Sequence, residues 1–313
     1  MNDAVADPAG PARRAVRVRG LTDLVDIPAA TFHMGSDRFY PEERPAHARH
    51  VEAFAIEAHP VTNAQFGAFV ADTGYVTVAE RDIDPADFPG ADPADLVPGA
   101  LVFTPTAGPV DLRDWRAWWR YVPGASWRHP RGPGSGLDGR PDHPVVHVAH
   151  ADADAYTRWA GRRLPTEAEW ECAARGGVEG LDYAWGDELH PDGKILANTW
   201  IGKFPYQNEG WGSTSPVGSH PANPLGLLDM IGNVWERTVD VFTPRHVPPG
   251  LATVTADGRP DLLAATTSPQ VVRVTKGGSH LCSPQYCRRY RPAARSPQSD
   301  DSATSHLGFR CAV

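Results

Sequence analysis

The segment Trp159-Ala-Gly-Arg-Arg-Leu-Pro-Thr-Glu-Ala-Glu-Trp170 does most to decide how this chain folds. Its Thr166 can cap the N-terminus of a helix, and Glu169, three residues later, completes the spacing of a capping box. Gly176 provides a C-terminal stop for that helix. The segment therefore predicts a short helix that begins at Thr166 and ends before Gly176.

On the N-terminal side, we expect a further helix over residues 152–160, ended by Gly161. The apolar run Val145-Val-His-Val148 predicts a short strand before it. Residues 81–108 are rich in Asp, Pro and Ala and show little periodicity, so we expect a long loop there. Four tryptophans follow within residues 115–127.

A second capping box, formed by Thr62 and Gln65, begins an earlier helix that Gly74 can end. Apolar residues at helical spacing give this helix one buried stripe. The stripe consists of Phe66, Phe69 and Val70.

Short strands are predicted elsewhere, over residues 24–34 with a break at Pro28, over 54–56 and over 271–274. Gly and Asn interrupt the chain every few residues beyond Gly176. We therefore expect one α+β domain over residues 21–313 with little regular secondary structure. Residues 1–20 are rich in Ala, Pro and Arg, and we interpret them as a disordered leader.

Composition and charge restrict the classes of function. Net charge is −8 and the pI is about 5.9, which argues against nucleic acid, because phosphate binding needs a basic surface. No stretch reaches the roughly 18 apolar residues of a membrane span, and the leader lacks the apolar core of a secretory signal. We expect a cytoplasmic protein, in which the four cysteines are reduced and serve metal, redox or packing roles.

Cys282 and Cys287 lie five residues apart with Pro284 between them, and a turn there could bring their sulfurs together. Two thiolates are soft donors that suit Cu(I), whereas zinc requires four ligands that the neighbouring sequence does not supply. A disulfide and a pair of buried thiols are the alternatives that the residues alone leave open.

Several short motifs are distributed over the chain from Asp23 to its C-terminus. Besides the segment quoted first, they are Met34-Gly35, Val61-Thr-Asn63, His143-Pro-Val-Val-His147, Arg175-Gly-Gly177, Tyr183-Ala-Trp-Gly-Asp187, Gly226-Leu227, Gly232-Asn-Val-Trp-Glu236, Lys276-Gly-Gly-Ser279 with Cys282, Tyr286-Cys287, Arg289-Tyr-Arg291, Ala293-Ala-Arg295 and Leu307-Gly-Phe-Arg-Cys311.

In these motifs the sequence resembles the formylglycine-generating, or sulfatase-modifying factor, family. The resemblance implies a loop-rich fold similar to a C-type lectin. It also implies that Cu(I) lies between Cys282 and Cys287, that a substrate cysteine adds a third thiolate, and that O2 is the oxidant. The implied product is formylglycine, made from the cysteine of a sulfatase-type Cys-x-Pro-x-Arg segment by loss of a Cβ hydrogen and hydrolysis of the resulting thioaldehyde.

Further site residues follow from the same resemblance. Ser279 and Tyr286 match positions that line the family's active site, and Trp235 matches a tryptophan beside its oxygen pocket. The alternatives are a turn hydroxyl for Ser279 and core packing for both aromatic residues. Arg289 and Arg291 could order the thiol segment through carboxylate pairs or favour the thiolate form, or they could lie on a solvated strand face.

The resemblance also implies two structural Ca²⁺ sites, because the family's loops supply oxygen ligands. The loop of the first site is shorter here than in relatives, and Asx-turns are the alternative explanation for these side chains. The first site would use Asn198, the carbonyl of Thr199, Glu209 and the carbonyl of Trp211; the second would use Asp229, Glu236 and the carbonyls of Gly232 and Val234.

Some positions depart from the family pattern. Arg237 and Val241 stand where relatives carry aromatic residues, and His150 replaces a tryptophan. Arg237 could change a substrate groove or pair with a nearby carboxylate, and with His150 it motivates one alternative, the same oxidation on a different thiol. A noncatalytic binding protein on the same scaffold is a further alternative, although such proteins usually lack the thiol pair. Cys172 lies two helical positions from where a partner for Cys311 would be expected, and two helical residues turn by about 200°, so we predict no disulfide. We expect a monomer.

Overall fold

The computed structural model describes residues 20–246 and 271–313, so the expected leader lies outside the described residues except for Gly20. The chain forms a loop-rich α+β fold, as the sequence predicts. In the described ranges no helix is long and apolar enough to cross a bilayer. The helices are α1 (Asn63–Thr73), α2 (His150–Ala160) and α3 (Glu167–Arg175), and the strands are β1 (Leu24–Ile27), β2 (Ala30–Met34), β3 (His47–Val51), β4 (Phe54–Glu57), β5 (Gly99–Phe103), β6 (Trp119–Pro123), β7 (Trp235–Val241), β8 (Val272–Lys276), β9 (Arg295–Ser299) and β10 (Leu307–Gly308).

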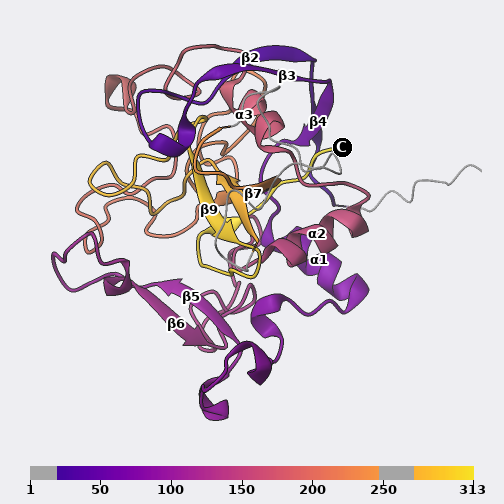
Figure 1. Cartoon of the computed structure of the whole chain (residues 1–313), viewed down its shortest axis with the longest axis vertical. Helices are drawn as coiled ribbons and strands as arrows, with labels where there is room; N and C mark the ends of the chain where they lie inside the picture. The colour runs from indigo at the N-terminus through magenta and orange to yellow at the C-terminus, as the bar shows by residue number, and fades with distance from the viewer. Residues whose placement is uncertain (1–19, 247–270) are drawn as a thin grey trace, which may run out of the picture.

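A four-stranded sheet in the order β10-β7-β8-β9 lies at the centre of the molecule (Figure 1). β8 runs antiparallel to both β7 and β9, and β10 pairs parallel with β7. The register between β7 and β8 shifts between Arg237 and Val241, which marks an irregularity in β7. The other strands form three two-stranded sheets, β1-β4, β2-β3 and β5-β6.

The helix signals of the sequence act as predicted. Thr62 and Thr166 close capping boxes at the starts of α1 and α3, and left-handed glycines follow all three helices. α2 begins at His150, two residues before the predicted start. The Asp152 carboxylate accepts a hydrogen bond from the backbone N–H of Ala149 at 2.8 Å, which satisfies a donor at the N-terminus of the helix.

Two apolar clusters organise the fold. α1 and α2 lie side by side (Figure 1) and share a cluster of aromatic rings around Phe66, which stacks on Tyr156 and meets Phe309 edge-on. α3 packs through Trp170, which is fully buried, into a second cluster with β2, β3 and β4. α3 also contacts β7 and β8, which joins the second cluster to the central sheet.

The structure corrects two sequence predictions. The run 145–148 is not a strand: its valines are buried, but His147 adopts φ 59°. Its backbone groups bond to distant loops instead, with Val145 N–H donating to Val61 O and His147 N–H to Thr304 O. The expected loop 81–108 also contains β5, which pairs with β6 in the tryptophan-rich region.

Candidate active site

The thiol segment, residues 279–287, consists of consecutive tight turns that follow β8. The backbone N–H of Cys282 donates to Ser279 O at 2.9 Å, and that of Cys287 donates to Ser283 O at 2.7 Å. These turns fold the five-residue spacing back on itself. Consequently the two sulfurs face each other at an Sγ–Sγ distance of 3.0 Å.

Both sulfurs are buried and unoxidised. Cys282 is 2% and Cys287 8% exposed, and both are free thiols. They share an apolar cluster with Ile231, Trp235 and Tyr290. A disulfide, one of the alternatives left open by the sequence, is absent from this arrangement, since a covalent bond would need about 2.05 Å.

The two thiols have opposite acid–base behaviour. The pKa of Cys287 is lowered to about 7, because Cys282 hydrogen-bonds to its sulfur and because Arg289 adds positive charge and further hydrogen bonds. Burial, together with the neighbouring sulfur, raises the pKa of Cys282 well above its ordinary value. As the pH rises through about 7, the pair therefore passes to a form with one proton, in which Cys282 S–H donates to the Cys287 thiolate. The thiolate is the form that binds metals.

Two glycines allow the segment to approach the rest of the fold. Gly277 and Gly278 have φ of 91° and 72°, a region that side chains rarely adopt. A Cβ at Gly278 would lie 2.8 Å from Arg289 O, and one at Gly277 would lie 3.0 Å from the Trp170 ring. The Lys276-Gly-Gly-Ser279 motif thus lets the chain pass between Trp170 and the backbone at Arg289.

Carboxylates from a distant loop hold the basic residues after the thiols. Arg289 donates to Glu42 Oε1 at 2.5 Å and lies 3.9 Å from the centre of the Tyr40 ring. Arg291 makes a two-pronged pair with Glu43, with contacts of 2.9 and 2.5 Å. Arg289 and Arg291 are therefore the carboxylate-paired residues that one sequence hypothesis expected, not a solvated strand face.

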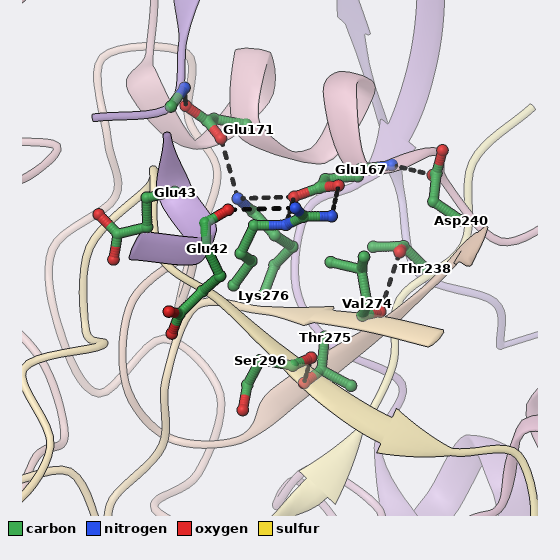
Figure 2. Close-up of polar contacts among 12 residues, drawn as sticks. Glu42, Glu43, Glu167, Glu171, Thr238, Asp240, Val274, Thr275, Lys276 and Ser296 are labelled. Carbon is green, nitrogen blue, oxygen red and sulfur yellow. Dashed lines mark hydrogen bonds and ion pairs between the residues drawn. The ribbon is translucent and has the colours of Figure 1, made fainter. Parts of the chain in front are cut away.

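The ion pairs of Arg289 and Arg291 adjoin a buried network of charged side chains that involves α3 and β8. Figure 2 shows Glu167 and Glu171 reaching from α3 towards Lys276 on β8, which bonds to Glu171 at 2.9 Å. Arg295 pairs with Glu167 and donates to the backbone carbonyl of Glu42. Burial alone would raise the pKa of Glu171, but the positive charges of Lys276 and Arg175 outweigh it and lower this pKa to about 2. Paired charges of this kind stay ionised without water, so the network fixes the strands that carry the thiol segment.

The other predicted site residues have distinct environments. Ser279 is fully buried, and its hydroxyl accepts from the backbone N–H of Leu281 at 3.2 Å, so it supports the turn. Trp235 is buried in the cluster that contains both thiols. Tyr286 is 41% exposed and is therefore not a core aromatic.

An aromatic wall that sequence reasoning missed lies beside the thiols. Tyr286 stacks on Phe204 with ring centres 5.0 Å apart and meets Trp118 edge-on at 5.1 Å. Trp200 and Phe103 extend the wall. The density of tryptophan in residues 115–127 was its only sequence signal. Trp118, Trp200 and Phe204 are buried, so the wall supports Tyr286, the exposed ring at its end in the thiol segment.

The donor set at the thiols fits Cu(I). Two facing sulfurs, one of them ionised, provide soft ligands for a metal that accepts two of them. Among the described residues, no group of three or more His, Cys, Asp or Glu side chains is arranged to hold a metal, so the four-ligand set that zinc requires is not formed there.

The first calcium set is partly brought together. Asn198, Thr199 and Trp211 line one cavity of about 420 Å³. Glu209 is exposed, is not among the residues lining that cavity, and accepts a hydrogen bond from Gln207 at 3.0 Å. Three of the four predicted ligand residues therefore line the same cavity, whereas the Glu209 carboxylate does not.

The second calcium set is already organised by other contacts. Both oxygens of Glu236 accept from Arg310, and one of them also accepts from the Trp170 indole. Asp229 accepts from the backbone N–H of Gly218 at 2.8 Å. With Glu236 neutralised by a buried arginine, this set does not fit Ca²⁺ as arranged.

Neither Arg237 nor His150, the two departures from the family pattern, lines any of the four main cavities formed by the described residues. Arg237 is fully buried and donates to the backbone carbonyls of Val148 and Ser302. Arg237 also lies close enough to His150 that its charge helps to lower the pKa of that imidazole to about 4, after burial and Arg273. The idea that Arg237 reshapes a substrate groove is therefore wrong: its cation ties β7 to neighbouring loops.

The family described as the sulfatase-modifying factor enzyme 1-like domain matches residues 11–313. The chain belongs to this family. It is 63% identical to a formylglycine-generating enzyme of Mycobacterium tuberculosis, over 93% of this chain and 97% of that protein. It is 47% identical to a formylglycine-generating enzyme of Streptomyces coelicolor, over 99% of this chain and 93% of that protein.

Relatives that are named as inactive also match this chain. A mouse protein named inactive C-alpha-formylglycine-generating enzyme 2 is 37% identical, over 92% of this chain and 85% of its own length. Among solved structures, PvdO from Pseudomonas aeruginosa superposes with a TM-score of 0.60 at 22% identity, covering 93% of this chain and 94% of PvdO. That likeness supports the fold alone.

Proposed function

We propose that this protein is a copper-dependent oxidase that uses O2 to convert a peptidyl cysteine, in a Cys-x-Pro-x-Arg segment, to formylglycine. The observation that carries the proposal is the buried pair Cys282 and Cys287, with facing sulfurs 3.0 Å apart. The relatives named formylglycine-generating enzymes, at up to 63% identity over nearly the whole chain, support the same reaction.

The chain's own groups prepare the site. Cys282 and Cys287 would hold Cu(I), whose chemistry is to supply electrons to O2 beside the substrate thiol. Arg289 keeps Cys287 ionised, and Glu42 keeps Arg289 in place. The apolar cluster around Trp235 excludes water from the sulfurs. The half-exposed Tyr286 ring, held in place by the buried aromatic rings behind it, offers a surface against which an extended peptide can lie.

Three further proposals accompany this one. Free thiols at all four cysteines support a reducing compartment such as the cytoplasm. The protein acts as a monomer. Ca²⁺ binds at the first set, around Asn198 and Thr199, where a cavity already exists. A melting temperature that rises with Ca²⁺ in the wild type but not in Asn198→Ala would support the calcium site; identical shifts in both would contradict it.

The function is tested by mass spectrometry of a Cys-x-Pro-x-Arg peptide incubated with Cu(I)-loaded protein and O2. We expect the mass change of cysteine becoming formylglycine, and none with Cys282→Ser or without O2. Full conversion by Cys282→Ser would refute the proposed site. Because inactive relatives exist, an unchanged peptide, despite tight copper binding, would direct the search to other thiols.

A further inference from the structure

A second cavity, of about 310 Å³, shares a wall with the thiol segment. His280 lines it, and Cys282 follows two residues later in the turn that begins at Ser279. Phe103, from the aromatic wall, lines it on another side. The cavity therefore lies beside the turn that leads to Cys282 and beside one ring of the aromatic wall.

Two guanidinium groups face this cavity, those of Arg131 and Arg140, and no Asp or Glu is among its lining residues. Arg140 Nη1 donates to Ser213 Oγ at 3.3 Å. Neither arginine forms an ion pair with a carboxylate of the described residues. This sets them apart from Arg289, Arg291 and Arg295, each of which has a glutamate partner.

The two cations also oppose each other. The pKa of Arg140 is lowered by partial burial and by the charge of Arg131. Bringing two like charges to one cavity costs free energy, and an anion between them would remove that cost. Polar groups that can support an anion lie alongside, with Ser213 and Thr214 on the same wall.

The hydrogen bond of His280 to the backbone determines which ring nitrogen of this residue carries the hydrogen. Its Nδ1 lies 2.8 Å from the carbonyl oxygen of Asn233, which can only accept, so Nδ1 carries the hydrogen. In the neutral ring Nε2 is then an acceptor. The imidazole therefore offers no hydrogen bond to an anion, and the arginines are the groups that would bind one.

We propose that Arg131 and Arg140 bind a carboxylate of the substrate polypeptide, an acidic side chain that flanks the target cysteine. This inference rests on the proposed function, because it places the substrate cysteine at the thiol pair. A carboxylate matches the planar fork of a guanidinium. The site adds selectivity for acidic sequences to the reaction, since a peptide with lysine at the same position is repelled.

The experiment measures binding of fluorescent peptides whose target cysteine is replaced by serine, to the whole protein without copper. Glutamate and glutamine are compared at each of several positions on both sides of the serine, because they differ in charge but hardly in shape. We expect one position at which the glutamate peptide binds about tenfold more tightly. The preference should shrink as salt is raised.

The variants locate the effect. Arg131→Gln and Arg140→Gln should each remove most of the glutamate preference while leaving the glutamine peptide unchanged, and Arg131→Lys should retain part of it. Arg158→Gln is the matched control, because Arg158 is exposed on α2, lies outside the cavity and forms its ion pair with Asp154. Arg131 is exposed, so Arg131→Gln and its charge reversal test the site even if Arg140→Gln fails to fold.

Two results would overturn the inference: no position that distinguishes glutamate from glutamine, or a preference that persists in both variants. Conversion of a glutamine-containing cysteine peptide by the copper-loaded wild type is measured separately. Conversion without a glutamate preference would defeat only the inference, whereas a preference without conversion would defeat only the proposed function.

Discussion

The four cysteines of this chain form two contrasting groups, although all are buried and free. Cys172 and Cys311 lie in separate apolar clusters, and burial, with help from Glu171 and Glu57 respectively, raises the pKa of each thiol. Cys282 and Cys287 are equally buried, yet the pKa of Cys287 falls to about 7. A second sulfur and a positioned arginine, not exposure, therefore separate reactive thiols from packing thiols.

The largest effect on activity is expected when one sulfur of the Cys282–Cys287 pair is removed. Cys282→Ser or Cys287→Ser should lower peptide oxidation by more than the roughly 10–100-fold that loss of a group supporting a metal ligand costs. The reason is that each change deletes one of only two soft ligands. Turnover of the cysteine peptide checks this, and either variant retaining wild-type turnover would contradict it.

A smaller effect is expected when both sulfurs are kept and the Glu42 carboxylate that holds Arg289 is removed. Glu42→Gln releases Arg289 and should slow peptide oxidation about tenfold. Because Arg289 then stabilises the Cys287 thiolate less, the rising limb of the pH–rate profile should move to higher pH. Glu52→Gln is the control, since Glu52 is exposed and pairs with His50. A lower rate with an unmoved profile would show that Glu42 acts only through folding.

Alkylation by a small thiol reagent compares the reactivity of Cys287 with that of Cys172 directly. The thiolate fraction rises as pH passes the pKa, so Cys287 should be labelled with a midpoint near pH 7. Cys172, whose pKa is about 11, should remain unlabelled over the same range. Peptide mapping by mass spectrometry after a short exposure measures both, and equal labelling of the two cysteines would contradict the account.

The smallest effect is expected at the packing thiols. Cys172→Ala and Cys311→Ala should retain peptide oxidation and should each lower the free energy of unfolding by about 1–2 kcal/mol, as small buried truncations do. Thermal melts read out the stability, and turnover reads out the activity. Lost turnover in a variant that melts normally would place that cysteine in the reaction.

Local signals account for what the sequence predicted well. Capping boxes at Thr62 and Thr166 act within one helical turn, so both helices could be located from a few residues. The close approach of Cys282 and Cys287 follows from a five-residue spacing and a turn. These features need no information about the rest of the fold.

The features that the sequence did not predict depend on contacts between residues far apart in the chain. Residues 145–148 are apolar enough for a strand, but their partners are loops around Val61 and Thr304. Arg289 and Glu42 are 247 positions apart, so nothing near the thiols in sequence identifies the carboxylate that holds the arginine. The contacts of Arg237 could not be predicted either, because the residues whose carbonyls it binds, Val148 and Ser302, lie 89 and 65 positions away along the chain.

The most direct test of the central claim is a Cu(I) titration of reduced protein against a competing chelator, on two double variants. The protein with Cys172→Ala and Cys311→Ala keeps only the proposed pair and should bind one equivalent of copper tightly. The protein with Cys282→Ser and Cys287→Ser should bind none in competition with the chelator. A tight equivalent in the second protein, or its absence from the first, would contradict the assignment of copper to Cys282 and Cys287.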